Sequence, residues 1–522
     1  MMKADFSLTL DARKVSASID AELIPHIARL ADLPEQDILS FRILKRSLDA
    51  RKKPCVKIIY RVEAELKDGC RPRNTEKPLP EKEKWIPPEN RFGLKNPLIV
   101  GTGPAGLFAA LLLAEAGADP VVLDCGYDVE KRKADIDLFF QTRTLNPKSN
   151  LLFGEGGAGT WSDGKLYTRV RDPRASYVLE KFVENGADPS ILYYSHPHIG
   201  SDKLPAVIAS IREKIISLGG SFLWGHEVTD IEGEDSFRAL RLADGSRMEG
   251  PGALIACGHS ARDLILALTS RIGYAMKGFQ IGCRIEHPQS FINRNQFGAA
   301  ESFPALGAAE YLFSTHGDKH VQGATTFCMC PGGEILPAAS EPGALSTNGM
   351  SRAARDGKFA NSALISTLSA DLFPTPAEAF SFLSGLEKEV YRLGGNNYTA
   401  PAQNAPDFIE GRISGKLRDS SFGFGIVPER LDKLVPEPVR SALKAALLRF
   451  DVLAPGFLRE GVLVGMETKV SSPVRFLRDP ETLSSTMKGL YLGGEGGGTA
   501  GGIVSAAIDG LRLAEAWLKA NR

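Results

Sequence analysis

The stretch that decides the fold is LIVGTGPAGLFAALLLAEAGADPVVLD, residues 98–124. A short apolar strand leads into the glycine turn GTGPAG at 101–106, and a helix follows over 104–116. A second strand over 120–123 ends in Asp124. Strand, GxGxxG turn and helix in this order are typical of a Rossmann-like unit, and an acid about 20 residues further on accepts hydrogen bonds from a ribose. The sequence therefore predicts a bound dinucleotide.

Each residue type in the turn has a physical role. Gly101 permits the tight turn, Gly103 lets the backbone approach a pyrophosphate, and Gly106 lets helix and strand pack closely. Pro104 and Ala105 lie in the first helical turn, whose free N–H groups and positive dipole favour an anion. The turn alone fits either FAD or NAD(P).

Two further glycine-rich segments favour FAD. The first, FGEGGAGTWSDG at 153–164, lets bare backbone lie against a flat ring. The second, GLYLGGEGGGTAGGIVSAA at 489–507, reads as a strand, a glycine turn carrying Glu495, and a helix that begins near 501 or 502. A third segment, GALIACGHS at 252–260, predicts a strand that returns to the same sheet. We find no second strand–GxGxxG–helix copy, so we expect NAD(P)H at most as a transient reductant.

Length and charge limit the class of protein. A chain of 522 residues predicts two or three domains, and equal totals of 63 basic and 63 acidic residues exclude a whole-molecule field that attracts nucleic acid or membranes. The seven cysteines are scattered and the N-terminus does not resemble a secretion signal, so we expect a cytoplasmic protein. The uncharged stretch 97–114 is interpreted as a soluble strand and helix, with no membrane contact.

The domain prediction has three parts. Residues 1–90 form a small α+β module and linker, with strands near 6–10 and 55–66, a helix near 21–31 and a polar linker over 67–97. Residues 96–280 and 465–522 form the FAD-binding domain. Residues 281–464 form an inserted α+β substrate domain, and the substrate is expected at the junction.

Basic residues concentrate over Arg42–Lys53 in the N-terminal module. A solvated face is one interpretation. A docking patch for an anionic partner, RNA or protein, is the alternative.

Several longer motifs carry a resemblance, which covers nearly the whole chain. They are RSLDARKK (46–53), VGTGPAGLFAA (100–110), FGEGGAGTWSDGKL (153–166), PHIGSD (197–202), GHSARD (258–263), IGCRIEHPQ (281–289), TFCMCPGG (326–333), TNGMS (347–351), ETKVSSPVR (467–475) and GGEGGGTAGGIVSAAIDG (493–510). The chain resembles FAD-dependent dehydrogenases with the glutathione-reductase-type fold. More narrowly, it is similar to uncharacterised bacterial FAD-dependent proteins with an N-terminal ferredoxin-like domain.

The resemblance implies contacts with non-covalent FAD. Adenine is expected at Val228, the isoalloxazine over 157–162, and the ribityl and pyrophosphate at Glu495. Two departures are Asp124, where a glutamate is commoner, and Cys257, where a threonine is usual. The expected cofactor-binding residues are Gly101, Gly103, Pro104, Ala105, Gly106, Asp124, Cys125, Gly126, Gly157, Ala158, Gly159, Thr160, Ser162, Val228, Cys257, Gly258, Gly494, Glu495, Gly501, Gly502 and Ile503.

No catalytic residue is assigned from the sequence. The candidate proton donors are the motif histidines His196, His198, His259 and His287, although the favoured interpretation of each one is a hydrogen-bonded structural histidine. Cys328 and Cys330 form CxC rather than CxxC, which favours buried thiols over a redox pair, and no spacing predicts a metal site. Lys165 and Arg284 are candidates for holding an anionic substrate.

The function predicted is an FAD-dependent oxidoreductase that moves a hydride between flavin and an unidentified small organic substrate. The alternative is a flavoprotein that docks RNA or a protein through its basic module, with catalysis secondary or absent. A redox-silent structural FAD is the third possibility.

Overall fold

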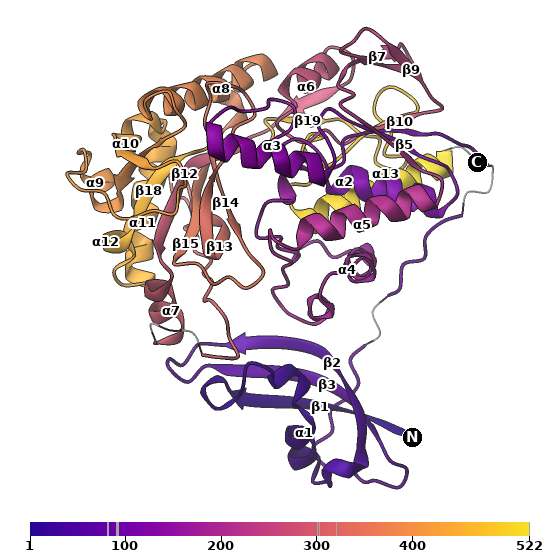
Figure 1. Cartoon of the computed structure of the whole chain (residues 1–522), viewed down its shortest axis with the longest axis vertical. Coiled ribbons are helices and arrows are strands. Elements are labelled where there is room, and N and C mark those ends of the chain that lie inside the picture. Colours follow the sequence, from indigo (N-terminus) through magenta and orange to yellow (C-terminus); the bar gives the residue numbers. More distant parts are fainter. Residues whose placement is uncertain (81–82, 90–92, 300, 302, 320, 521–522) are drawn as a thin grey trace.

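The protein has three parts in this computed structural model, which describes residues 1–80, 83–89, 93–299, 301, 303–319 and 321–520. An N-terminal module lies below two larger bodies (Figure 1). One contains the strands of the predicted FAD-binding domain and is called the FAD-binding body. The other is the insert. The remaining positions of the predicted linker, insert and C-terminal end, namely 81–82, 90–92, 300, 302, 320 and 521–522, lie outside the described residues.

The N-terminal module is an antiparallel sheet with strand order β1-β3-β2. Its elements are β1 (Met2–Asp11), α1 (Ile24–Ala31), β2 (Ile38–Asp49) and β3 (Lys57–Leu66). Alternate residues of β3 are fully buried, including Ile58, Tyr60 and Val62, because the period of a strand directs them to one face. The ferredoxin-like prediction holds only for a β-α-β-β portion, since residues 1–80 contain no second α-helix and no fourth strand.

The edge strand β2 joins this module to the FAD-binding body. The Arg46 N–H donates to the Tyr193 carbonyl at 2.8 Å, and the Ser195 N–H donates to the Arg46 carbonyl at 3.0 Å. The Arg46 guanidinium lies 3.1 Å from Asp20, 4.6 Å from the Tyr194 ring centre, and donates to the Ala305 carbonyl at 2.6 Å. The module is therefore fastened to both larger bodies.

These contacts occupy much of the predicted basic cluster. Besides Arg46, Arg42 pairs with Glu63 at 3.3 Å and Arg51 with Asp49 at 2.7 Å, while Lys53 donates to a backbone carbonyl of the insert. Docking of a partner through this cluster stays a prediction, with less free charge than the sequence suggested.

The FAD-binding body is built on a parallel sheet of order β20-β10-β4-β5-β6. The strands are β4 (Leu98–Val100), β5 (Val121–Asp124), β6 (Ser221–Trp224), β10 (Ala253–Ile255) and β20 (Leu490–Leu492). Chain segments nearly four hundred residues apart thus share one sheet, as the glycine-rich motifs predicted. Around it lie α2 (Pro104–Glu115), α3 (Val129–Thr142), α4 (Arg174–Glu184), α5 (Leu204–Ser217), α6 (Arg262–Thr269) and α13 (Ile503–Ala520).

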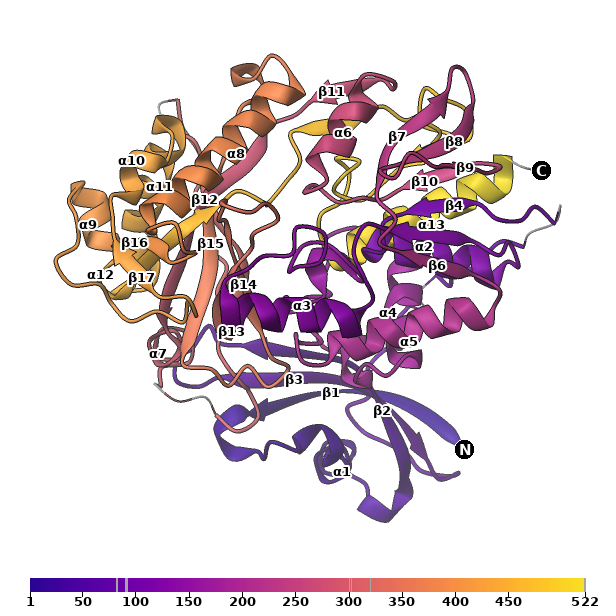
Figure 2. The same cartoon turned by 45° about the horizontal axis from the view of Figure 1, so that its top comes forward.

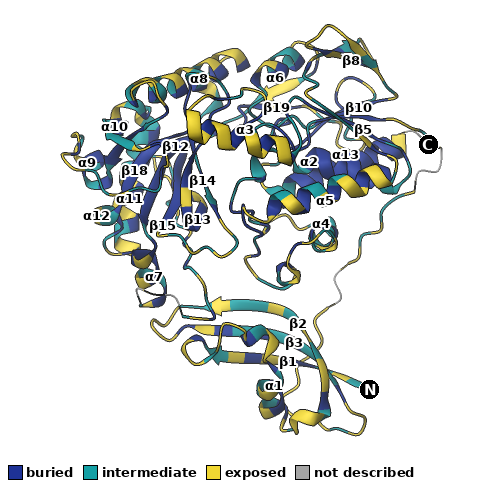
Figure 3. Cartoon of the chain, in the orientation of Figure 1, coloured by how far each residue is buried: buried dark blue, intermediate teal, exposed yellow. Residues whose placement is uncertain are grey.

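Helix α2 explains the uncharged stretch. Ten of its residues, 105–114, are buried, and α2 and α13 form the dark interior of this body in Figure 3. Such burial within protein accounts for a helix that is apolar on all sides. Among the described residues, no helix has both the length and the apolar character to cross a membrane.

The insert is a seven-stranded mixed sheet of order β14-β13-β15-β12-β18-β16-β17. Helices α9 to α12 lie on its side away from the FAD-binding sheet in both Figure 1 and Figure 2. Its elements are β12 (Phe279–Pro288), α7 (Gln289–Phe297), β13 (Ala324–Pro337), β14 (Thr347–Ser351), β15 (Phe359–Leu368), α8 (Pro376–Leu393), β16 (Ala400–Asn404), α9 (Ala405–Glu410), β17 (Ile426–Pro428), α10 (Leu431–Leu434), α11 (Glu437–Leu453), α12 (Phe457–Glu460) and β18 (Val462–Glu467).

Two small sheets complete the FAD-binding body. An antiparallel sheet of order β7-β8-β9 follows β6, and a two-stranded sheet, β11-β19, lies beside the insert's entry and exit. The strands are β7 (Val228–Gly233), β8 (Phe237–Leu242), β9 (Arg247–Glu249), β11 (Tyr274–Met276) and β19 (Val474–Phe476).

Candidate functional site

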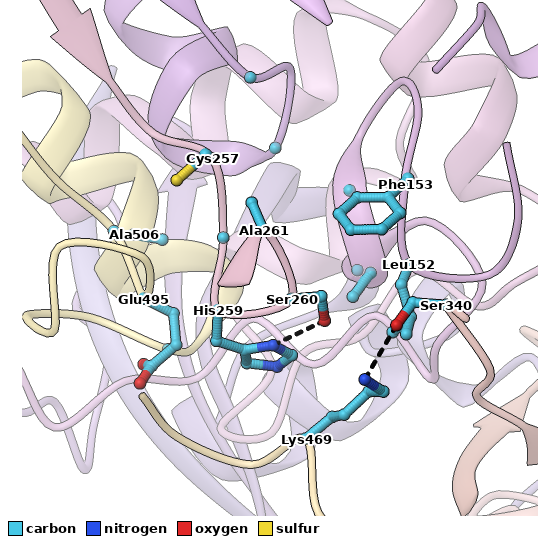
Figure 4. Close-up of a pocket in the computed structure, with 18 of the residues that line it drawn as sticks. Leu152, Phe153, Cys257, His259, Ser260, Ala261, Ser340, Lys469, Glu495 and Ala506 are labelled. Carbon is cyan, nitrogen blue, oxygen red and sulfur yellow. Dashed lines mark hydrogen bonds between the residues drawn. The ribbon is translucent and has the colours of Figure 1, made fainter. Parts of the chain in front are cut away.

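A cavity of about 1020 Å³ lies where the carboxyl ends of the parallel strands meet the insert. Residues that directly follow β4, β10 and β20 line it, among them Gly101, Ala256 and Gly494. Ligands of open α/β sheets bind at this edge. Ser340 of the insert and Lys469, two residues after the insert strand β18, form the opposite side (Figure 4).

The first glycine turn brings backbone to the cavity. Gly101 has φ +98°, and a Cβ there would collide with the Ala256 carbonyl. A Cβ on Gly106 would collide with the Gly101 carbonyl, so Gly106 packs under the turn rather than lining the cavity. Gly103 is different, because the nearest protein atom to a Cβ there would be the Gly157 Cα at 4.0 Å. The N-terminus of α2 therefore faces open space.

Asp124 lines the cavity but also orders the turn. Its carboxylate accepts hydrogen bonds from the Thr102 N–H at 3.0 Å and from the Gly126 N–H at 2.8 Å. Each carboxylate oxygen has more than one acceptor position, so a ribose contact stays compatible with these bonds. Gly126 itself packs against the backbone of Gly154 and Lys148, outside the lining.

Arg132 of α3 holds the backbone of the second glycine segment, 153–164, and of the residues just before it. This fully buried guanidinium donates to the carbonyls of Asn150 at 2.8 Å and Gly154 at 3.2 Å, and also to that of Glu155. The Thr160 hydroxyl donates to the Glu155 carbonyl at 3.0 Å, so Thr160 supports the loop rather than lining the cavity. Sequence reasoning missed Arg132, because most of its hydrogen-bond partners are backbone carbonyls, which no sequence motif marks.

The third segment places a second helix N-terminus at the cavity. Gly501, Gly502 and Ile503, at the start of α13, are lining residues. The Glu495 carboxylate accepts from the Ser472 N–H at 2.8 Å and lies 3.6 Å from the Lys277 ammonium. Burial raises the pKa of Glu495, while Lys277 opposes that shift.

The cavity gathers eighteen of the expected cofactor-binding residues; Gly106, Gly126 and Thr160 support its walls. Whether each of the eighteen contacts a cofactor stays a prediction. They are Gly101, Gly103, Pro104, Ala105, Asp124, Cys125, Gly157, Ala158, Gly159, Ser162, Val228, Cys257, Gly258, Gly494, Glu495, Gly501, Gly502 and Ile503.

Of the four candidate histidines, only His259 lines the cavity. Its Nδ1 lies 2.9 Å from the Ser260 hydroxyl (Figure 4). Burial, with the nearby charges of Lys469 and Arg262, lowers the pKa of His259 to about 3, so the ring is neutral at ordinary pH. His287 is buried elsewhere and meets the Phe457 carbonyl at 2.8 Å.

The other two histidines bond outside the cavity. His196 lies 3.1 Å from Glu310, and His198 lies 3.1 Å from the Ala353 carbonyl. Both therefore hold segments of the fold together.

The candidate anion-binding residues separate in the structure. Arg284 is fully buried, pairs with Glu467 at 3.0 Å and Asn361 at 2.8 Å, and does not line the cavity. Lys165 does line it. Arg284 is therefore a structural residue.

A buried charge network at the insert side was missed by the sequence interpretation. Lys469 donates to the Ser340 hydroxyl at 3.0 Å and lies 3.4 Å from Glu387, which also pairs with Arg262 at 2.6 Å. Lys469 lies in the motif ETKVSSPVR and Arg262 in the motif GHSARD. Only the fold brings α6, α8 and the end of β18 together. The network joins the FAD-binding body to the insert.

Cys328 and Cys330 both line the cavity. Cys330 is buried, as expected, whereas Cys328 is exposed at the cavity wall. Desolvation within the cavity still raises the pKa of the Cys328 thiol to about 12, although Lys165 opposes the shift. Thiols held protonated are poor nucleophiles, which disfavours redox chemistry here. Among the described residues, no group of three or more His, Cys, Asp or Glu is placed to hold a metal ion.

The residues present fit FAD. Two helix N-termini supply backbone N–H donors for phosphates, and glycines at 101, 103, 157 and 494 leave the walls without side chains. Asp124 and Glu495 supply acceptors for hydroxyl groups at separate places.

Comparison with known proteins agrees with this fit. Residues 96–157 match an FAD binding domain, 278–470 match the "FAD-dependent protein, C-terminal domain-like" family, and 2–65 match a domain of unknown function. A Clostridium beijerinckii protein, described as uncharacterized, is 39% identical over 523 residues, covering 97% of this chain and 98% of that protein. This chain belongs to that family of FAD-dependent proteins.

The similarity of this FAD-dependent protein to two solved structures is low in both sequence identity and TM-score. Glycine oxidase from Geobacillus kaustophilus is 11% identical with a TM-score of 0.36, over 81% of this chain and 94% of its own. The FAD complex of glycerol-3-phosphate dehydrogenase from Bacillus halodurans is 9% identical with a TM-score of 0.37, over 82% and 65%.

Proposed function

We propose that the protein is an oxidoreductase that moves a hydride between FAD and a small organic substrate. The observation that supports this most is one cavity shared by three glycine segments of the FAD-binding body and by side chains of the insert. The glycine segments suit the cofactor, and the insert side suits a second molecule.

Within this proposal, the chain's own residues bind, orient and exclude water. The N-termini of α2 and α13 would hold the phosphates of FAD. Arg132 fixes the second glycine segment, which would contact the flavin ring. FAD, when bound, supplies the hydride acceptor or donor. The insert would enclose the substrate. Its residue Glu387 pairs with Arg262 of the FAD-binding body and with Lys469, and these ion pairs hold the insert against the cavity.

The visible spectrum of the purified protein tests the proposal. We expect the bands of oxidised flavin, release of FAD on denaturation, and anaerobic bleaching by a substrate or by NADH or NADPH. The matched variant is Gly103→Val, because a side chain there meets no nearby protein atom yet enters the expected phosphate space. It should fold and lose FAD, whereas colourless wild-type protein that refuses added FAD contradicts the proposal.

A further inference from the structure

Lys165 is a cation that the fold encloses without fully pairing. It follows the second glycine segment, lines the cavity, and its side chain is only 15% exposed. The nearest carboxylate oxygen, on Asp163, is 3.8 Å away. Both oxygens of Asp163 already accept from Arg355, at 2.9 and 2.6 Å.

The neighbouring acid is occupied as well. One Glu310 oxygen accepts from Arg355 and the other lies 3.1 Å from His196. Within the described part of the chain, the Lys165 ammonium therefore donates no hydrogen bond. Three N–H donors on a largely enclosed ammonium favour an acceptor supplied by a ligand, because donors held away from water without a hydrogen bond are costly.

The other cavity cations lack this capacity. Lys148 lies 2.7 Å from a Glu227 carboxylate oxygen and its side chain is half exposed. Lys469 donates to Ser340, and Arg262 is paired through two nitrogens with Glu387, at 2.6 and 3.1 Å. Their donors already have protein acceptors. Lys165 is thus the cavity cation best able to bind an added anion.

Large apolar side chains also line the cavity, and two of them lie near Lys165, because its charge acts on Tyr167 and on Cys328, the residue after Phe327. Tyr167, Leu312 and Phe327 line it and are 43%, 57% and 40% exposed. Large apolar side chains gathered in a cavity beside one charge are typical of a ligand site. Ser162, expected at the flavin ring, lies three positions before Lys165.

We propose that Lys165 binds the carboxylate of a small substrate whose apolar body lies against Tyr167, Leu312 and Phe327. A single ammonium among apolar groups suits a monoanion better than a phosphate, which usually takes an arginine fork or several donors. This inference rests on the proposed function and deepens it: the substrate class is an apolar monocarboxylate.

Calorimetric titration of the FAD-loaded protein tests the inference, with 3-phenylpropionate and hexanoate as probes. We expect one site for at least one of these carboxylates. 3-Phenylpropanamide lacks the negative charge, and acetate lacks the apolar group. Each should therefore bind at least about 10-fold more weakly.

Three variants separate charge from structure. Lys165→Met should weaken carboxylate binding roughly 10- to 100-fold, the effect of losing a charge-assisted hydrogen bond, without changing amide binding. Lys165→Arg should retain part of the affinity. Lys214→Met, on the exposed face of α5, is the matched control and should bind like wild type.

Two results overturn the inference. One is that neither carboxylate binds the FAD-loaded wild type. The other is that the Lys165→Met variant melts like wild type and binds both carboxylates as tightly as wild type does. Failure of the proposed function looks different. A protein that binds the carboxylates yet shows no substrate-linked bleaching keeps the Lys165 site and rejects the oxidoreductase. If the flavin is bleached by an uncharged substrate and no carboxylate binds, the oxidoreductase proposal is kept and the Lys165 site is rejected.

Discussion

Gly510, within α13, lies directly against the carbonyl oxygen of Ala105 in the first turn of α2. A Cβ at 510 would fall well inside van der Waals contact with that oxygen and with its carbonyl carbon. Glycine thus lets the two helices cross with their backbones in contact. Because both helices begin at the cavity, this crossing fixes the spacing of the two expected phosphate sites.

Gly510→Ala should therefore separate the helices. We expect a loss of about 1–3 kcal/mol in unfolding free energy, the usual cost of overpacking, and weaker FAD binding. Gly385→Ala is the control, because Gly385 is also within a helix, α8, but has open space around it. It should gain up to about 1 kcal/mol and leave FAD binding unchanged. Denaturant unfolding and flavin fluorescence measure both quantities, and equal effects of the two changes would refute the crossing argument.

Arg46→Ala should loosen the N-terminal module. The change leaves Asp20 without its 3.1 Å partner and removes the bond to the Ala305 carbonyl, so we expect a loss of roughly 2–4 kcal/mol. Hydrogen exchange at the Tyr193–Ser195 backbone, which pairs with β2, should speed up. Arg42→Ala, whose side chain is 70% exposed, should change neither quantity. Unchanged exchange in the Arg46 variant would show that the module is held by other contacts.

Glu310 should make stability depend on acid. Burial by itself would raise its pKa, but the hydrogen bond with His196 and the charges of Arg355 and Lys165 hold the pKa at about 2. Because the folded pKa is below the unfolded one, the stabilisation is complete above about pH 5 and is lost as pH falls toward 2.

Comparison of wild type with Glu310→Gln isolates this contribution. The variant should be less stable by roughly 1–3 kcal/mol at pH 6, and the gap should shrink by pH 3. Glu35→Gln, at an exposed position of the N-terminal module, is the control. Denaturant unfolding across this pH range gives the answer, and a gap that stays constant would exclude the assignment.

Cys328 should react slowly with iodoacetamide despite its access to the cavity. Alkylation requires the thiolate, and desolvation raises the pKa of Cys328 to about 12. Both residues are exposed, but the thiolate of Cys328 is disfavoured within the cavity. Cys55, on the N-terminal module, should therefore be modified first, at least about 10-fold faster at neutral pH. Peptide mass spectrometry over time compares the two sites. Equal or faster labelling of Cys328 would restore a redox role for the CxC pair.

Local patterns in the sequence were sufficient to predict the strand, turn and helix that bring the first glycine turn to the cavity. The strand before Gly101, the helix after Gly103 and the acid at 124 are consecutive, so a short-range pattern predicts both the elements and their order. The ferredoxin-like prediction was only partly right. The module has the first strand, helix and two further strands of that fold, but residues 1–80 contain no second α-helix and no fourth strand. Arg132 and Gly510 could not be assigned roles, since their partners are backbone atoms distant along the chain.

The sequence by itself determined the dinucleotide-type turn and the glycine-rich segments that accompany it. Glycine, proline and apolar periodicity act on the local backbone, so they can be interpreted without the fold. Only the tertiary structure decided that Arg284 is a buried partner of Glu467 while Lys165 faces the cavity with free donors. Charge pairing depends on which side chains long-range packing brings within a few ångströms, and no local pattern specifies that.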